Sequence, residues 1–392
     1  MTGRPARAPG ADADRTARSG TAVENFTADD RHHMARALEL AARGLYTASP
    51  NPRVGCVIVR DGRVVGEGWH RRAGEAHAEV AALADAREHG RDVQGGTLYV
   101  TLEPCNRFGR TPPCVDALIE AGVARVIVAA HDPNPAQAGG SARLRAQGVV
   151  VDIGLLEAEA DALNVGFVSR HRRGLPWVRS KIAASIDGRT ALANGNSQWI
   201  TGAAARADGH AWRARACAVL TGVGTVLHDD PRLDVREVPT TRQPLRVVVD
   251  RHADTPAHAR ILAEGNALVI TAGARNDGWP AGTETVAMPD GAGRVDLDAM
   301  LRELARRGIN ELHVETGAKL NGALLRAGLI DELVIYVAGA VIGDPARGMF
   351  EFETPLASLD ARVALEWTSV ERIGEDLRVV ARIVRASPPT GS

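Results

Sequence analysis

The sequence has few cysteines, few aromatic residues and almost no lysine. Four cysteines in 392 residues cannot form the dense disulfide framework of small secreted proteins. Basic and acidic residues nearly balance, with 47 Lys and Arg against 48 Asp and Glu, so no overall positive field attracts nucleic acids. No apolar run reaches the ~18 residues that a transmembrane helix needs. We therefore expect a cytoplasmic protein that contacts neither membranes nor nucleic acids.

The composition that remains is that of an ordinary globular protein. The chain is 45% hydrophobic and 24% charged, and its length corresponds to two or three domains. Lys181 and Lys319 are the only lysines, and every other basic residue in the count of 47 is arginine. A single arginine therefore says little about function, whereas each lysine says more.

The first half of the chain predicts an α/β domain. Residues 1–24 are small, polar and rich in proline and glycine, so we expect a disordered tail. Asp61-Gly62 is a strong hairpin turn between two strand-like segments. The hydrophobic pattern predicts helices from Asp29 and His77 and near 113 and 142, and strands over 54–59, 64–69, 97–102, 125–130 and 149–153. This alternation indicates a layered domain over residues 25–173.

The charged stretch Arg170-His171-Arg172-Arg173-Gly174 precedes a second domain. It is either a joint between domains or the C-terminal end of a helix, where positive charges suit the helix dipole. After it we predict helices over 203–215, 297–307 and 320–327, and strands over 178–183, 218–221, 245–249, 267–271, 311–315, 333–337 and 377–383. We expect a domain over residues 174–386 and a short tail over 387–392. By its length, each domain is expected to fold and work independently.

His77, Glu79, Cys105 and Cys114 form a pattern typical of a catalytic zinc site. His77 and Glu79 open a predicted helix, and the two cysteines follow the strand predicted over 97–102. One imidazole and two thiolates are three ligands of a tetrahedral zinc ion and leave the fourth position for water. Zinc lowers the pKa of that water to roughly 7, and Glu79 is placed to transfer its proton as general acid and base. The same His-x-Glu and Pro-Cys pattern occurs in zinc nucleobase deaminases.

Two other interpretations of the cysteines remain open at this point. They can hold a structural zinc ion, or they can be two buried thiols. The His-x-Glu motif at a helix start favours the catalytic interpretation. We expect His70, His89, His131 and Cys56 to be core or surface residues, because none of them has a ligand-like spacing.

Four stretches of the first half resemble one enzyme family. They are NPRVGCVIV, HAEVAAL, TLEPCNRFGRTPPCVDALI and DPNP, and they resemble the deaminase half of the bifunctional riboflavin-biosynthesis deaminase/reductase family. The family usually has Ser-His after its Pro-Cys, whereas this chain has Asn106-Arg107, so Arg107 is expected beside the metal. The resemblance implies a cytidine-deaminase-like three-layer domain with zinc ligands His77, Cys105 and Cys114, the acid/base Glu79 and the substrate-binding residue Asn51.

The second half resembles the reductase half of the same family in the stretches SKIAASIDGRTA, SQWIT, TGVGTVLHDDPRLDVR and VETGAKLNGALLRAGLIDEL. The resemblance implies a dihydrofolate-reductase-like domain that uses NADPH. The implied substrate-binding residues are Lys181, Asp187, Ser197, Arg213, Arg236 and Glu315. The implied cofactor-binding residues are Ala184, Trp199, Thr225, Asp229, Leu233, Gly317, Ala318, Lys319, Leu320, Asn321, Gly322 and Ala323. A Rossmann domain is not supported, because Leu227 stands where the fingerprint that begins at Gly222 needs its third glycine.

Together the two halves predict a homo-oligomeric, bifunctional enzyme of riboflavin biosynthesis. It would deaminate 2,5-diamino-6-(5-phosphoribosylamino)pyrimidin-4(3H)-one at zinc and then reduce the ribosyl group to a ribityl chain with NADPH. One alternative is a paralogue with the same deaminase chemistry that serves a pyrimidine-derived secondary metabolite, such as the azapteridine toxin toxoflavin, and has an altered or inactive reductase half. A deaminase-like nucleic-acid-binding module is a second alternative, although 4% aromatic residues and balanced charge argue against it. A non-catalytic structural zinc protein is the third.

Overall fold

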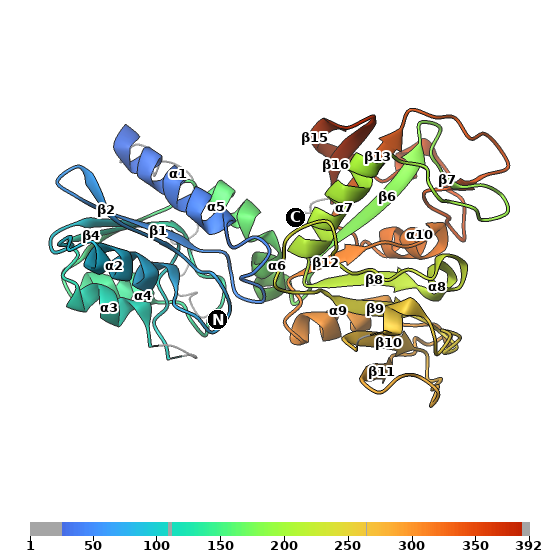
Figure 1. Ribbon diagram of the computed structural model, residues 1–392, viewed down its shortest axis with the longest axis horizontal. Coiled ribbons are helices and arrows are strands. Elements are labelled where there is room, and N and C mark those ends of the chain that lie inside the picture. Colours follow the sequence, from blue (N-terminus) through green and yellow to red (C-terminus); the bar gives the residue numbers. More distant parts are fainter. Residues whose placement is uncertain (1–25, 109–111, 264, 386–392) are drawn as a thin grey trace, which may run out of the picture.

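The computed structural model describes residues 26–108, 112–263 and 265–385, and it contains two sheets joined through a short helical segment (Figure 1). The tails expected over 1–24 and 387–392 lie outside the described residues, as do residues 109–111 of the family-like stretch before Cys114. In the part of the chain that is described, no helix combines the length and the apolar character needed to cross a membrane.

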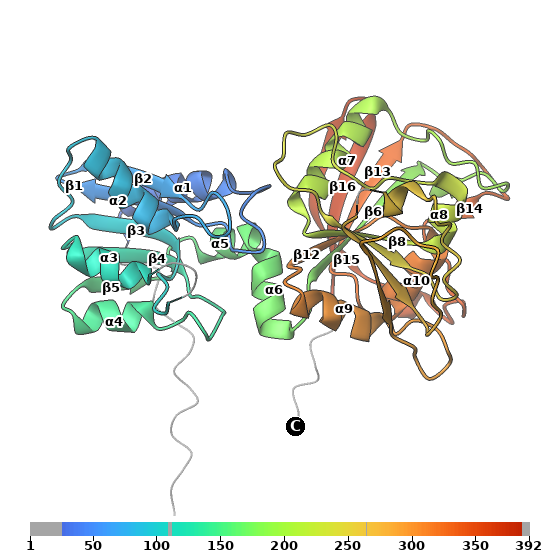
Figure 2. The ribbon, with the colours of Figure 1, turned by 60° about the horizontal axis from the view of Figure 1, so that its bottom comes forward.

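The first sheet forms the middle layer of a three-layer domain. Its strands lie in the order β2-β1-β3-β4-β5, with β1 antiparallel to β2 and β3, and with β3, β4 and β5 parallel. Helices α1 and α5 cover one face and α2, α3 and α4 the other (Figure 2). The elements are α1 (Ala28–Ala42), β1 (Gly55–Arg60), β2 (Arg63–Trp69), α2 (Ala78–Glu88), β3 (Thr97–Leu102), α3 (Cys114–Glu120), β4 (Arg125–Ala130), α4 (Gly140–Ala146), β5 (Val150–Ile153) and α5 (Glu157–Leu163).

Local sequence explains the hairpin and the close packing of α1. Asp61 and Gly62 both have positive φ, of 51° and 71°, as the primed turns of two-residue hairpins require. A Cβ on Gly55 of β1 would lie 1.9 Å from the carbonyl oxygen of Ala37. Helix α1 therefore rests directly on strand β1.

The second sheet has nine strands in the order β11-β10-β9-β8-β12-β6-β13-β16-β15. From β11 to β13 in this order, each strand is parallel to the next. Strand β16 is antiparallel to both of its neighbours, β13 and β15. Its elements are β6 (Trp177–Ser185), α7 (Ala203–Arg215), β8 (Ala218–Gly222), α8 (Val223–Asp229), β9 (Leu245–Val249), β10 (Ala267–Thr271), β11 (Thr283–Ala287), α9 (Leu297–Arg306), β12 (Glu311–Val314), α10 (Ala318–Arg326), β13 (Glu332–Ala338), β15 (Leu365–Ile373) and β16 (Asp376–Ile383). A separate two-stranded sheet pairs β7 (Arg189–Ala191) with β14 (Arg347–Gly348), and the 3-10 turns are Arg260–Leu262 and Leu359–Ala361.

The two faces of this sheet differ in polarity because side chains alternate along each strand. On β12, Leu312 and Val314 belong to the apolar cluster that includes residues of α9 and α10. Glu311 points to the opposite face, where α7 supplies Arg215 at 2.6 Å. Arg179 of β6 lies on the same face, with its guanidinium 4.6 Å from the centre of the Trp212 ring of α7. The face under α7 is therefore charged.

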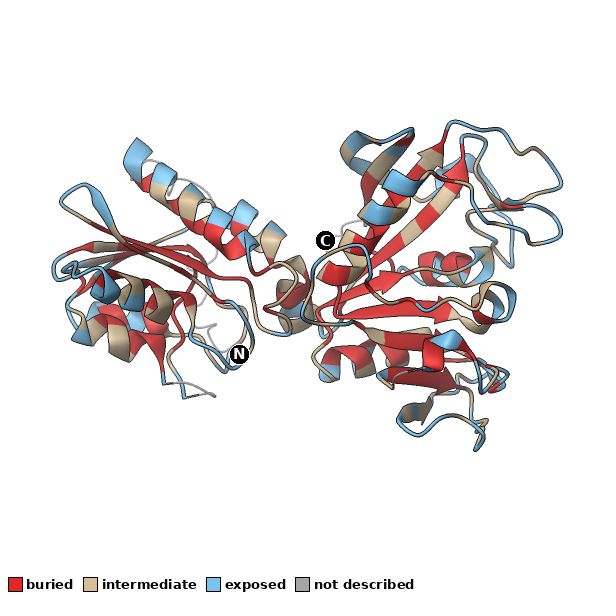
Figure 3. Ribbon diagram, in the orientation of Figure 1, coloured by how far each residue is buried: buried red, intermediate tan, exposed pale blue. Residues whose placement is uncertain are grey.

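Helix α6 (Val165–Arg173) connects the two sheets, so the charged stretch is the end of a helix. Gly174 ends α6 in the left-handed conformation with φ 69°. Arg173 pairs with Asp331 at 2.7 Å in the second half. Gly166, Phe167 and Ser169 of α6 are buried, and so is Glu311 at the start of β12. Figure 3 shows that buried residues concentrate in the two sheets and in the helices that cover them.

Candidate active sites

The expected metal ligands come together at the edge of the first sheet. His77 is the N-cap of α2, Cys105 follows β3, and Cys114 is the first residue of α3. The Nδ1 of His77 lies 3.2 Å from the Sγ of Cys114 and 3.5 Å from the Sγ of Cys105, and all three ligand atoms lie within 4.8 Å of one another. One imidazole nitrogen and two buried thiols at this spacing fit a tetrahedral zinc ion.

Glu79 lies in the first turn of α2, two residues after His77, and is only 3% exposed. Burial, assisted by the charge of Cys105, raises the pKa of Glu79 to about 7. The carboxyl group lines the same cavity as His77 and Cys105. A buried carboxyl group with a raised pKa beside a zinc site can hold and release a proton near neutral pH.

Asn51 and His70 meet in this cavity. The Nδ1 of His70 lies 3.0 Å from the carbonyl oxygen of Ala76, which only accepts, so Nδ1 carries the hydrogen. The Nε2 of the neutral ring therefore accepts from the Nδ2 of Asn51 at 3.0 Å. The His70 ring also stands edge-on to the His77 ring, with centroids 5.3 Å apart. The sequence did not indicate this role for His70.

The other three residues without ligand-like spacing behave as expected. Cys56 is fully buried in the first core, and His89 and His131 are exposed. In the described residues all four cysteines are free.

The pocket beside the metal cluster has a volume of about 370 Å³, and both halves of the chain line it. Besides His77, Glu79 and Cys105, its walls include Asn51, His70, Arg107, Asp132 and Asn134 from the first domain. Helix α6 contributes Phe167, Arg170 and His171, and the second half contributes Gly308. Burial raises the pKa of Asp132 to about 6. Arg107 and Arg170 place two guanidinium groups among the described wall residues.

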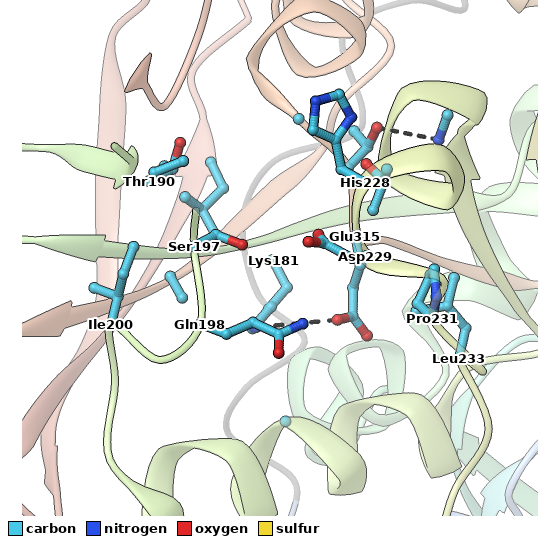
Figure 4. A pocket seen from close by; sticks show the side chains of 18 of the residues that line it. Lys181, Thr190, Ser197, Gln198, Ile200, His228, Asp229, Pro231, Leu233 and Glu315 are labelled. Atoms are coloured by element: carbon cyan, nitrogen blue, oxygen red, sulfur yellow. Dashed lines mark hydrogen bonds and ion pairs between the residues drawn. The ribbon is translucent and has the colours of Figure 1, made fainter. Parts of the chain in front are cut away.

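A second and larger pocket of about 1480 Å³ lies at the carboxyl ends of β6, β8 and β12 (Figure 4). Ligands of open α/β sheets bind at such strand ends. Its walls include thirteen of the residues that the resemblance assigns to substrate and NADPH: Lys181, Ser197, Trp199, Arg213, Thr225, Asp229, Leu233, Arg236, Glu315, Gly317, Ala318, Lys319 and Leu320.

A group of charges occupies the floor of the second pocket. Arg213 pairs with both carboxylate oxygens of Glu315, and the Nζ of Lys181 lies 4.0 Å from the same carboxylate. Burial opposes the ionisation of Glu315, but Arg213 outweighs it and holds the pKa of Glu315 well below its usual value. Burial lowers the pKa of Lys181.

Five expected reductase-site residues are not among the described wall residues of this pocket: Ala184, Asp187, Asn321, Gly322 and Ala323. Asp187 accepts from the backbone N–H groups of Ile342 and Gly343 and so fixes a neighbouring loop. Asn321 is buried and accepts from the hydroxyl of Ser180 at 2.8 Å. These contacts give each of the two a local structural role behind the pocket.

Two protein-family models match the chain. The cytidine and deoxycytidylate deaminase zinc-binding region matches residues 27–130, and the RibD C-terminal domain matches residues 176–379. Among relatives, the riboflavin biosynthesis protein RibD of Escherichia coli K12 is 48% identical over 334 residues, which cover 82% of this chain and 90% of that protein. RibD of Haemophilus influenzae is 44% identical over 369 residues, which cover 90% of this chain and 97% of that protein.

Two solved structures match the fold of this chain over 91% of its length. RibD of Acinetobacter baumannii has a TM-score of 0.84 and 41% identity, covering 91% of this chain and 99% of that chain. A deaminase/reductase from Thermotoga maritima has a TM-score of 0.83 and 34% identity over the same shares. The expected fold, a cytidine-deaminase-like domain followed by a reductase domain, is confirmed. The chain belongs to the RibD family of bifunctional deaminase/reductases of riboflavin biosynthesis, with a zinc deaminase domain and an NADPH-dependent reductase domain.

Proposed function

We propose that the first site hydrolytically removes one amino group from 2,5-diamino-6-(5-phosphoribosylamino)pyrimidin-4(3H)-one and that the second site reduces the ribosyl group of the product. The observation that carries the first step is the grouping of His77, Cys105 and Cys114 beside the buried Glu79. The Thermotoga maritima relative is named for this deaminase and reductase pair. We do not retain the toxin-pathway alternative, because the relatives that match 82–90% of this chain are named as riboflavin-biosynthesis proteins.

In the first step, zinc held by His77, Cys105 and Cys114 supplies Lewis-acid activation of the attacking water. Glu79 would take one proton from that water and deliver it to a pyrimidine ring nitrogen. It would then take the second proton from the added hydroxyl group and deliver it to the amino group, which leaves as ammonia while the hydroxyl oxygen becomes the carbonyl oxygen. Its raised pKa suits both transfers at neutral pH. The Oδ1 of Asn51 is left to accept from a ring N–H or an amino group, because its Nδ2 is engaged by His70. Arg107 and Arg170 supply positive charge for the phosphate end of the substrate.

In the second step, NADPH supplies the hydride that opens the ribosyl ring to a ribityl chain. Gly224 and Gly317 border open space that can hold the dinucleotide, since a Cβ added to either would meet no atom within 4 Å. Gly317 precedes α10, so the free backbone N–H groups of that helix favour an anionic phosphate. Lys181, Arg213 and Arg236 then face the ribose phosphate, and Glu315 keeps Arg213 in place.

We also propose that the protein forms a cytoplasmic homo-oligomer. The free cysteines suit a reducing compartment. Strand β15 lies at one edge of the nine-stranded sheet and exposes 66% of Trp367 and 59% of Val370, a surface that a second copy can cover. Sedimentation at several protein concentrations tests this, and a monomer throughout would refute it.

The deciding experiment is incubation of the purified protein with the phosphoribosyl diaminopyrimidinone, with and without NADPH, followed by mass spectrometry. The deaminated ribosyl compound should accumulate without NADPH, and the ribityl compound should form when NADPH is present. A protein that deaminates but never oxidises NADPH would have an inactive reductase half. A protein that leaves the starting compound unchanged would refute the proposed substrate.

A further inference from the structure

Asn310 belongs to the reductase half of the chain but contacts two residues of the deaminase pocket wall. It lies immediately before β12 and is 4% exposed. Its Nδ2 donates to the carbonyl oxygen of Pro50 at 2.8 Å, and its Oδ1 accepts from the Nε of Arg170 at 2.6 Å. Pro50 and Arg170 both line the deaminase pocket. One amide therefore connects the loop before β1 with helix α6.

The chemistry of the two partners fixes the orientation of this amide. A guanidinium only donates hydrogen bonds, and a backbone carbonyl oxygen only accepts them. With the amide turned over, Oδ1 would face the carbonyl of Pro50 and Nδ2 would face Arg170, and both contacts would be lost. Asparagine thus suits this position because it offers one donor and one acceptor at the same carbon.

The backbone of Asn310 is held by the reductase sheet. Its carbonyl oxygen accepts from the N–H of Trp177 at 2.8 Å, and its N–H donates to the Sγ of Cys217 at 3.4 Å. A Cβ on Gly166 of α6 would lie 2.6 Å from that carbonyl oxygen, so α6 rests directly on this backbone. The backbone that carries the amide is therefore held by the reductase sheet and by α6, and accurate positioning of a site requires such rigid support.

Both partners of Asn310 lead to groups that face the substrate. Pro50 precedes Asn51, which lines the pocket and whose Nδ2 donates to the His70 ring. Arg170 is half-buried, and among the described residues no carboxylate lies within ion-pair distance of it. Its other hydrogen bond reaches the Nε2 of His171 at 3.1 Å. The Arg170 charge is consequently available to an anion in the pocket.

We propose that Asn310 is a positioning residue for the deamination reaction, through which the reductase half holds the Pro50–Asn51 segment and the Arg170 side chain in their substrate-binding arrangement. This inference rests on the deaminase function proposed above. Asn310 touches neither the metal ligands nor Glu79 in any hydrogen bond of the described residues. Its loss should therefore weaken substrate binding more than it slows the chemical step.

Two substitutions test the proposal. Asn310→Asp keeps the size and an acceptor for Arg170 but replaces the donor to Pro50 with a carboxylate oxygen. Asn310→Ala removes both contacts. We expect the KM for deamination to rise about tenfold in Asn310→Asp and about 100-fold in Asn310→Ala, with kcat within about threefold of wild type. Reduction of supplied deaminated intermediate should stay within about twofold of wild type.

Asn266→Asp is the matched control. The Nδ2 of Asn266 donates to the carbonyl oxygen of Pro244 at 3.0 Å, so this variant loses the same kind of contact within the same half of the chain. Neither Asn266 nor Pro244 lines the deaminase pocket. The deaminase KM of Asn266→Asp should therefore equal that of wild type.

Each outcome decides the matter. A rise in deaminase KM in both Asn310 variants, with zinc content, melting temperature and reductase kinetics retained, supports the proposal. Unchanged deaminase kinetics would overturn it, and so would a parallel fall of both activities with the melting temperature, which indicates a structural role alone. If Asn310→Ala does not fold, the nearly isosteric Asn310→Asp gives the same decision. Wild-type protein that does not deaminate would refute the proposed function, and the inference with it.

Discussion

Arg53 and Glu311 form a buried ion pair between the two halves of the chain. Their side chains are 5% and 1% exposed, and the Nη1 of Arg53 lies 2.6 Å from the Oε1 of Glu311. The same carboxylate also accepts from Arg179 at 3.0 Å and from Arg215 at 2.6 Å. One carboxylate thus compensates three guanidinium groups, one of which belongs to the deaminase half. A buried ion pair therefore connects the two halves, although each half is long enough to fold as an independent domain.

We predict that Glu311→Gln destabilises the whole protein. The substitution leaves Arg53 and Arg215 without their carboxylate and Arg179 with Glu332 alone, and breaking a buried ion pair costs about 3–5 kcal/mol of unfolding free energy. Arg53→Met should cost less, because Glu311 keeps Arg179 and Arg215. Urea denaturation followed by circular dichroism measures both. The control is Asp298→Asn, which breaks the exposed pair with Arg302 and should change the free energy by less than about 0.5 kcal/mol.

The same carboxylate predicts a pH dependence of stability. Burial alone raises the pKa of Glu311, but Arg215, Arg53 and Arg179 outweigh it and hold the pKa well below its usual value. A group with a depressed pKa stabilises the fold fully above its unfolded pKa of ~4.3, and this contribution is lost as the pH falls toward its folded pKa. The difference in unfolding free energy between wild type and Glu311→Gln should be constant above pH ~5 and shrink below pH ~4.3. A constant difference down to pH ~3 would contradict the ion-pair explanation.

The metal site predicts one zinc ion per chain, measured by elemental analysis of protein purified without chelator. Cys105→Ser and Cys114→Ser should lose zinc and deamination together, because each removes a ligand from a set of three. Cys56→Ala is the matched control, since Cys56 is also a buried free cysteine of the first domain but lies outside the cluster. It should retain zinc. Full deamination by metal-free protein would refute the site.

Glu79→Gln should keep zinc but lose deamination by about 10²–10⁴ in kcat, because an amide preserves the shape of the side chain but cannot take a proton from water. Steady-state kinetics and metal analysis of the same sample measure the two effects. Reduction of supplied deaminated intermediate should continue at the wild-type rate. A fall in kcat of less than about tenfold, with zinc retained, would remove Glu79 from the mechanism.

Strong periodic segments were predictable from the sequence, and weak ones were not. The strands over 97–102 and 125–130 and the helix over 203–215 match the structure to the residue, because each shows a clear apolar run or face between turn residues. Strand β15 was not predicted, since six of its nine residues are exposed at a sheet edge and no alternation marks it. The short helix α5 was also missed, whereas the end of a helix was one of the two interpretations of the charged stretch that became the end of α6. Helix α5 packs on β3, β4 and α1 of the first domain, and α6 packs on β6 and β12 of the second, so these contacts rather than a local pattern stabilise the two helices.

The chemical residues of the first site were predictable for a different reason. His77, Glu79, Cys105 and Cys114 each carry chemistry that few other residue types can supply, so spacing alone identified them. His70 and Asn310 were not predictable, because their roles come from contacts made by the fold. His70 follows β2 and meets Asn51, which precedes β1. Asn310 contacts Pro50, which lies 260 positions earlier in the chain.

The two lysines of the chain provide the last prediction, since both line the second pocket. Lys181 lies on β6 beside Glu315 at 4.0 Å, on the proposed ribose-phosphate side. Lys319 lies in the first turn of α10, where the helix N-terminus favours the phosphates of NADPH.

A charged hydrogen bond contributes about 1.5–3 kcal/mol to binding. Lys181→Met should therefore raise the KM for the deaminated intermediate about 10- to 100-fold, and Lys319→Met should raise the KM for NADPH by a similar factor. Each variant should leave the other KM and the deaminase rate near their wild-type values. Initial rates with one substrate varied at a time separate the two constants, and a rise of the same constant in both variants would contradict the proposed placement of substrate and cofactor.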